Sequence, residues 1–192
     1  MTIDDSKYHI SDEEEIKNEF LVVRQSVRDP SKFQVLYDRY FETIFTFVFR
    51  RIDHEDVTAD ITSQVFYKAL KNLKKYKFRG VPFSAWLYRI ATNEVYLYYK
   101  NNKRKQVYSL EEERFQEIID DNLFDDEIDV SEVIEAMKSL SEKEAEILEL
   151  RFFEEKPFAE IAYILEISEA NAKMRTYRSL EKLKRQLTRK VK

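Results

Sequence analysis

Two stretches of the chain carry positive charge at a density that suits contact with a polyanion. Residues 74–105 hold nine Lys or Arg and one acid, Glu94, and residues 173–192 hold nine Lys or Arg and one acid, Glu181. The whole chain has a net charge of -4, so this positive charge is concentrated in two places. Lys and Arg side chains that neutralise phosphates gain affinity from counterion release. The pattern predicts two polyanion-contacting surfaces, and the alternative is that the charge only keeps two helices soluble.

The first basic stretch interleaves its cations with aromatic rings. Exposed rings can stack on unpaired bases, worth about 1 to 3 kcal/mol per base, while the cations hold the nucleic-acid backbone. Packing is the alternative for any single ring, because aromatic residues at helical spacing usually belong to a core. The loop at residues 76–83, which contains the single Gly of the chain, is the best candidate for contacting bases. The interleaved rings are Tyr76, Phe78, Phe83, Trp86, Tyr88, Tyr96, Tyr98 and Tyr99.

The second basic stretch lies in a segment typical of a helix-turn-helix. Residues 158–184, FAEIAYILEISEANAKMRTYRSLEKLK, combine a short helix, a tight turn and a longer basic helix. The second helix of such a motif can enter the major groove with its N-terminal side chains facing base edges. The base-edge candidates are Glu169, Asn171, Lys173 and Met174, and the phosphate candidates are Arg175, Arg178, Lys182 and Arg185.

One position in this turn departs from the usual pattern. Glu166 stands where Gly is common, and a non-Gly residue at positive φ costs on the order of 1 kcal/mol. The alternative interpretation is therefore an ordinary helical hairpin with a solvated basic tail.

Composition argues against several other classes of protein. The chain has no Cys and only two His, His9 and His54, so thiolate or histidine metal centres and cysteine nucleophiles are not expected. No carboxylates converge with a phosphate-binding loop, so we expect neither an enzyme nor a cofactor. No run approaches the roughly 18 apolar residues of a membrane span, and the acidic N-terminus is unlike a signal peptide. A cytoplasmic location is expected.

The elements that must position these residues are predicted to be helices throughout. One Gly and three Pro in 192 residues leave too little turn punctuation for antiparallel sheets. Ser11 with Glu14 and Ser141 with Glu144 have the form of capping boxes, and Ser84 and Ser168 are candidate N-caps. The expected helices cover about residues 12–27, 31–52, 57–76, 84–102, 141–153, 158–165 and 169–190, with a further helix starting near 131.

The helix at residues 57–76 is predicted to have one buried face. Its apolar side chains recur at three and four positions, as a core-facing helix requires. The residues expected inside are Ile61, Val65, Phe66, Ala69, Leu70 and Leu73, and those expected outside are Asp60, Thr62, Gln64 and Lys68.

Charge and periodicity together divide the chain in two. Between Gln106 and Ser131 no helical stripe persists, and residues 111–129 hold ten acids against Arg114 alone. We therefore expect an all-α protein of two small domains, 1–105 and 132–192, joined by an acidic linker at 106–131, with the helix-turn-helix in the C-terminal domain.

With both halves described, the chain resembles an extracytoplasmic-function sigma factor, a small class of bacterial RNA polymerase specificity subunit. FQVLYDRYFETIFTFVFRRI resembles the opening helix of that family, and TADITSQVFYKAL resembles its core-polymerase-binding helix. FSAWLYRIATNEVYLYYKNNKR resembles the helix that reads and opens the upstream (minus-ten) promoter element. The segment SLSEKEAEILELRFFEEKPFAEIAYILEISEANAKMRTYRSLEKLK resembles the C-terminal domain that binds the minus-thirty-five element.

The resemblance implies a function and roles for particular residues. The chain would direct promoter recognition, promoter melting and transcription initiation. The residues implied to dock on core RNA polymerase are Asp60, Ile61, Thr62, Gln64, Val65 and Phe66. Those implied to capture or grip the melted minus-ten strand are Lys77, Phe78, Arg79, Phe83, Trp86, Arg89, Asn93, Lys100, Lys103 and Arg104. The helix-turn-helix candidates above would bind the minus-thirty-five DNA.

Partners and alternatives follow from the same resemblance. Core RNA polymerase, promoter DNA and an anti-sigma factor would be the partners, and the acidic linker would either thread a basic polymerase channel or serve only as a tether. A stand-alone helix-turn-helix regulator, binding duplex DNA without polymerase, is the main alternative. A helical adaptor without nucleic-acid contact is a third possibility, but it leaves the two basic stretches unexplained.

Overall fold

The computed structural model describes residues 13–102 and 130–190. Within these ranges the chain forms helices, turns and short loops and contains no strand, so the predicted all-α class is confirmed. The described helices divide into two compact units: α1 to α4 form one, and α6, α7, α9 and most of α8 form the other. Most of the predicted acidic linker, and Ser11 of the first predicted capping box, lie outside the described residues.

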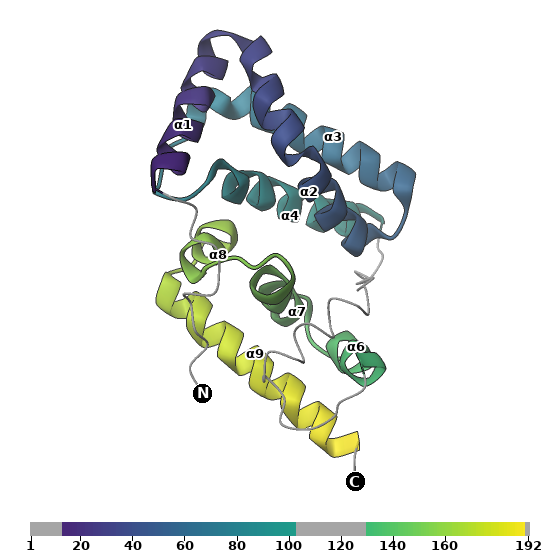
Figure 1. Ribbon diagram of the computed structural model, residues 1–192. Coiled ribbons are helices and arrows are strands. Elements are labelled where there is room, and N and C mark those ends of the chain that lie inside the picture. Colours follow the sequence, from purple (N-terminus) through teal and green to yellow (C-terminus); the bar gives the residue numbers. More distant parts are fainter. Residues whose placement is uncertain (1–12, 103–129, 191–192) are drawn as a thin grey trace. The chain divides into compact units, whose positions relative to one another are not determined.

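The first unit is a bundle in which α2, α3 and α4 pack against one another and α1 packs beside them (Figure 1). Its α-helices are α1 (Glu13–Arg28), α2 (Gln34–Ile52), α3 (Glu55–Asn72) and α4 (Phe83–Asn102), and its 3-10 turns are η2 (Pro30–Phe33) and η3 (Leu73–Lys75). Asp29 ends α1 and caps η2, because its Oδ1 accepts the Ser31 N–H at 3.0 Å. The Ser31 hydroxyl donates to the same oxygen at 2.7 Å, and this bond together with the backbone one lowers the pKa of the Asp29 carboxyl.

The buried face of α3 differs at two positions from the prediction. Thr62, expected outside, is fully buried, and Leu70, expected inside, is 38% exposed. The reason is that α3 packs on both α2 and α4, so its buried arc includes Thr58 and Thr62 as well as Val65 and Ala69. An apolar stripe in the sequence reveals only the packing partner that contacts apolar side chains. It does not reveal a second helix that packs against threonines.

The start of α4 also differs from the prediction. The helix begins at Phe83, so Ser84 lies inside its first turn and is buried, and it does not serve as the N-cap. The Phe83 N–H instead donates to Oε2 of Glu19 in α1 at 2.6 Å. A carboxylate from 64 positions away therefore satisfies one of the N–H groups that a helix start leaves open.

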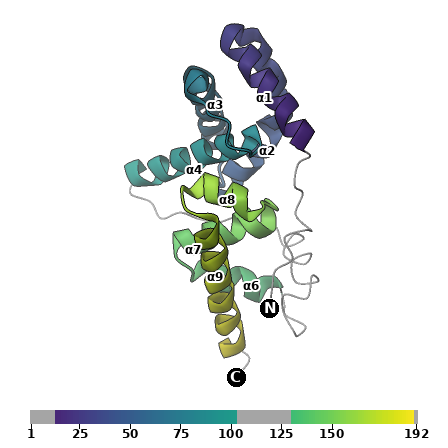
Figure 2. The ribbon, with the colours of Figure 1, turned by 90° about the vertical axis from the view of Figure 1, so that its left-hand side faces the viewer.

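The second unit contains α6 (Val130–Lys138), α7 (Glu142–Leu148), a π-helical turn η5 (Glu149–Phe153), α8 (Phe158–Leu165) and α9 (Glu169–Lys190). Both α6 and α7 pack against the long α9, as Figures 1 and 2 show from two directions. The predicted bounds of α8 and α9 are confirmed, and the helix predicted over 141–153 is α-helical as far as Leu148.

The predicted capping box at the start of α7 is confirmed. The Ser141 N–H donates to Glu144 Oε2 at 2.8 Å, and the reciprocal bond from the Glu144 N–H is also present. Lys182 of α9 donates to the same Glu144 oxygen at 2.7 Å, which lowers the pKa of the Glu144 carboxyl. Glu144 therefore both caps α7 and forms an ion pair that links α7 to α9. None of the described helices combines the length and apolar character needed to cross a bilayer.

Candidate nucleic-acid interface

The helix-turn-helix of the second unit is built around a tight turn between α8 and α9. Glu166 adopts φ 55°, the left-handed conformation expected for the position that often holds Gly. The turn closes because the Ile167 N–H donates to the Ala162 carbonyl at 3.0 Å. Ser168 caps α9 by accepting the Asn171 N–H on its Oγ at 3.3 Å, and Ala172 is fully buried beneath it.

The exposed face of α9 carries most of the predicted DNA contacts. Its opposite face is buried through Thr176, Leu180 and Leu183. Asn171 is partly buried, and its Oδ1 accepts from Nε of Arg175 at 3.0 Å, so these two side chains hold each other in place. The predicted contact residues that are exposed are Glu169, Lys173, Met174, Arg175, Arg178 and Arg185.

Lys182 is engaged within its own unit. Its Nζ lies 2.7 Å from Glu144 Oε2, and the side chain is 44% exposed. A phosphate contact by Lys182 would therefore have to compete with this ion pair.

The loop between η3 and α4 presents two cations and one ring to solvent. Lys77, Phe78 and Arg79 are exposed, and Gly80 adopts φ 74°, which only Gly adopts without strain. Phe83 is 1% exposed, so its ring is not offered to a base in this conformation. Phe78, at 37% exposed, is the ring of this loop that can stack on one.

Aromatic packing fixes the two ends of this loop. The Tyr76 ring lies 5.3 Å from that of Phe83 and 5.1 Å from that of Trp86, which is partly buried. Burial raises the pKa of the Tyr76 hydroxyl. The Phe78 ring is stacked at 5.0 Å and 27° on Phe20 of α1. The sequence analysis missed Phe20, because no local pattern links a residue of the first helix to this loop.

Along α4, two further predicted strand contacts are exposed and one is partly exposed. Asn93 and Lys100 are exposed, and Arg89 is partly exposed. Lys103 and Arg104 lie outside the described residues. The exposed cations of loop and helix therefore include Lys77, Arg79 and Lys100, all in one unit.

The predicted polymerase-docking set on α3 is divided between surface and core. Asp60 and Gln64 are exposed and one helical turn apart. The other four members, Ile61, Thr62, Val65 and Phe66, are at most 8% exposed. Only the first two offer side chains to a partner in this structure, and the others support the helix from within.

The neighbouring α2 carries an aromatic ladder that the sequence analysis did not identify. Successive ring centroids of Tyr37, Phe41, Phe45 and Phe49 lie 5.1, 6.0 and 6.3 Å apart. Phe49 is 37% exposed, and the middle rings are partly exposed. The i, i+4 spacing is the signal that would have found it. Partly exposed rings in a row are typical of a protein-contact surface.

Among the described residues, no three His, Cys, Asp or Glu side chains are grouped so that they could hold a metal ion.

Two family models match the chain, one in each unit. Residues 36–105 match sigma-70 region 2, and residues 136–185 match sigma-70 region 4. Together they cover more than half of the chain. The first model spans α2, α3, the exposed loop and α4, and the second spans the helix-turn-helix.

Curated relatives and a solved structure agree with these models. The chain is 27% identical over 171 residues to the ECF RNA polymerase sigma factor BldN of Streptomyces coelicolor, covering 87% of this chain but only 64% of that relative. It is 29% identical over 180 residues to the ECF sigma-E factor of Escherichia coli, covering 88% of this chain and 93% of the relative.

The solved structure of the sigma factor RpoE from Bartonella quintana, in complex with the anti-sigma factor NepR, has the same fold. Its TM-score is 0.55 at 19% identity, covering 81% of this chain and 96% of that one. With both regions matched in order on a helical fold that ends in a helix-turn-helix, the chain belongs to the sigma-70 family as an extracytoplasmic-function RNA polymerase sigma factor.

Proposed function

We propose that the chain binds core RNA polymerase through α3, captures the melted minus-ten strand with the loop at residues 76–83 and α4, and binds minus-thirty-five DNA through α9. The observation that carries this proposal is the loop, where Phe78 lies exposed between two exposed cations, Lys77 and Arg79. An exposed ring beside cations is suited to an unpaired base and its backbone, and duplex binding alone requires no such group. The proposal assigns no catalytic step to the chain.

Each proposed binding role belongs to one of the predicted domains. The proposed bounds are 1–105 for polymerase and minus-ten binding, 106–131 for the acidic linker and 132–192 for minus-thirty-five binding. An anti-sigma factor is a proposed partner, because the RpoE relative of known structure forms a complex with one. A cytoplasmic location is part of the proposal, since core RNA polymerase is the partner it requires.

The exposed pair on α3 should determine polymerase affinity. Replacing Asp60 and Gln64 with Ala is expected to weaken core binding about tenfold or more, because central interface residues can each contribute more than about 1 kcal/mol. Both side chains are exposed, so the free energy of unfolding should hardly change. Titration of labelled protein with core polymerase measures the affinity, and the exposed Glu42→Ala on α2 is the control. Unchanged affinity in the double variant would place the docking surface elsewhere, with the α2 ladder as the next candidate.

The two cations early in α9 should contribute to duplex affinity. Lys173→Ala or Arg175→Ala is expected to weaken binding of holoenzyme to minus-thirty-five duplex and to reduce its salt dependence by about one released ion each. The exposed Lys143→Ala on α7 removes the same charge from the same unit and should change neither. The measurement is the affinity of each holoenzyme for the minus-thirty-five duplex across a series of salt concentrations. Equal behaviour of the α9 variants and the control would remove α9 from the DNA interface.

Reconstitution with polymerase tests the proposed function as a whole. The purified chain is mixed with bacterial core polymerase, the complex is isolated by size exclusion, and transcription from a library of genomic fragments is sequenced. A stable complex that starts transcription at a defined set of promoters is expected. Absence of a complex, together with duplex binding by the chain alone, would instead support a stand-alone helix-turn-helix regulator.

A further inference from the structure

Two consecutive residues of α1, Glu19 and Phe20, contact the loop at residues 76–83, which is proposed to capture the minus-ten strand. Glu19 accepts the N–H of Phe83, where the loop ends and α4 begins, and Phe20 stacks on Phe78, the exposed ring of the loop. Phe20 also lies 6.3 Å from the Tyr76 ring, at the start of the loop. Neither α1 residue lies within the segment that matches sigma-70 region 2.

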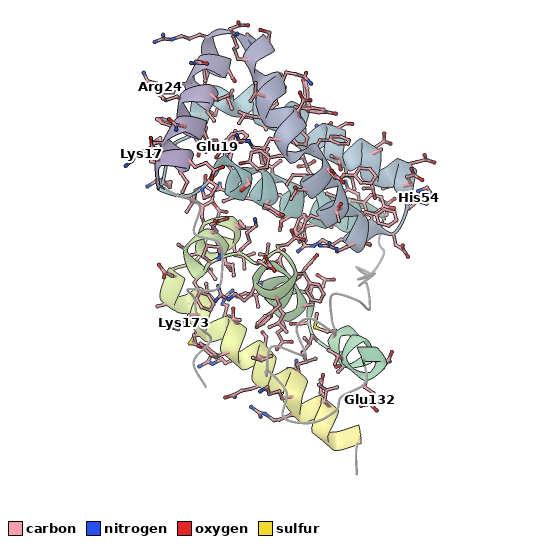
Figure 3. All side chains as sticks on the ribbon, in the orientation of Figure 1. Lys17, Glu19, Arg24, His54, Glu132 and Lys173 are labelled. Carbon is pink, nitrogen blue, oxygen red and sulfur yellow. The ribbon has the colours of Figure 1, made fainter. Side chains whose placement is uncertain are left out.

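The Glu19 carboxylate is held in one position by its other neighbours. It is 5% exposed, its Oε1 accepts the Tyr40 hydroxyl, and Nη1 of Arg39 lies 3.5 Å from the same oxygen. Burial and the adjacent carboxylate raise the pKa of the Tyr40 hydroxyl, so Tyr40 stays a donor. Figure 3 shows Glu19 on the inner side of α1, whereas Lys17 and Arg24 point outward. The second oxygen, Oε2, is thereby directed at the start of α4.

No side chain next to the start of α4 can accept the hydrogen bond from the Phe83 N–H. The residues before Phe83 are Val81 and Pro82, which carry no side-chain acceptor, and Ser84 lies within the helix. A charged acceptor at a helix N-terminus is favourable both as a hydrogen-bond partner and through the helix dipole. The first turn of α4 and the end of the loop therefore depend on Glu19 for their geometry.

We infer that Glu19 and Phe20 are positioning residues for base capture: Glu19 fixes the junction of loop and α4, and Phe20 backs the Phe78 ring so that its free side faces the unpaired base. The inference rests on the proposed function of the loop. A base that stacks on a ring already packed from behind meets a preorganised surface, and less ordering entropy is lost on capture. The consequence should be selectivity for the captured base as well as affinity.

The test compares variants of the full chain in holoenzyme with core polymerase. The probe is a single-stranded minus-ten oligonucleotide, from a promoter found by the transcription experiment, alongside the same strand with the captured base substituted. The measured quantity is the ratio of the two affinities. Glu19→Ala and Phe20→Ala are expected to reduce this ratio about tenfold or to abolish it. Glu19→Gln, which keeps an acceptor oxygen, should retain much of it.

Glu15→Ala is the matched control, because it removes the same charge one turn earlier on α1 from a side chain that is 62% exposed. It should keep the wild-type ratio. A purely structural role for Glu19 would lower affinity for core polymerase and both strands together and leave the ratio unchanged, and that result would overturn the inference. A wild-type holoenzyme that does not discriminate the two strands would overturn both the inference and the proposed role of the loop. If the Glu19→Ala and Phe20→Ala holoenzymes discriminate the two strands as well as the wild-type holoenzyme does, the inference is overturned and the proposed role of the loop stands.

Discussion

Replacing Phe66 with Ala is expected to lower the free energy of unfolding of the first unit by about 3 to 5 kcal/mol. The side chain is 3% exposed, and its ring lies 4.8 Å from that of Tyr37, 6.2 Å from Phe41 and 6.4 Å from Phe33. Truncation leaves a cavity under rings carried by α2 and the 3-10 turn η2, which cannot both move inward to fill it. Loss of polymerase binding should follow from unfolding, even though Phe66 itself offers no surface to a partner.

The measurement can be confined to the first unit, because the single Trp of the chain, Trp86, lies in α4. Urea unfolding followed by Trp86 fluorescence therefore reports on this unit. Tyr67→Ala is the control, since the neighbouring Tyr67 is 56% exposed and its loss should cost less than about 1 kcal/mol. If Phe66→Ala unfolds at the wild-type urea concentration but fails to bind polymerase, Phe66 belongs to the interface and the structural explanation is wrong.

Replacing Phe78 with Ala is expected to reduce promoter opening about 5- to 150-fold while leaving core binding intact. The range corresponds to the loss of one stacked base, about 1 to 3 kcal/mol. Phe78 is at the surface, so the bundle around Phe66 should be unaffected. Opening is measured as the rate at which heparin-resistant complexes form on a linear promoter fragment.

A second variant separates the ring from its other contacts. Phe78→Trp keeps an aromatic face and should open promoters at close to the wild-type rate, whereas Phe78→Leu keeps apolar bulk and should behave like Ala. Equal rates for Leu and wild type would show that Phe78 contributes only packing against Phe20 and that another group captures the base.

Local signals in the sequence were sufficient to predict most of the described helices. The helix-turn-helix is the clearest case, because the N-cap predicted at Ser168 and the predicted bounds of α8 and α9 depend only on residues close together in the sequence. Even the strained conformation of Glu166 was predictable, since the turn requires it whichever residue is present.

What could not be predicted depends on contacts between distant residues. The cap of α4 comes from Glu19, and nothing in the local sequence around Ser84 distinguishes a serine that caps from one that is buried in the first turn. Thr62 is buried because α3 has two packing partners, whereas a polar residue on a one-sided helix would be solvated. Val65 and Phe66, for which the family resemblance implies a partner-binding role, are likewise buried in this structure, and an apolar stripe in the sequence does not distinguish a core face from a docking face.

The most direct test places 2-aminopurine in the minus-ten element of a promoter found by the transcription experiment and records its fluorescence as holoenzyme binds. Unstacking of that base raises the fluorescence, so strand opening is observed directly. A fluorescence rise is predicted with wild-type holoenzyme, with no rise for core polymerase alone and little for the Phe78→Ala holoenzyme. Binding of the holoenzyme to this promoter without any rise would contradict strand capture by the first unit and leave the chain as a duplex-binding factor.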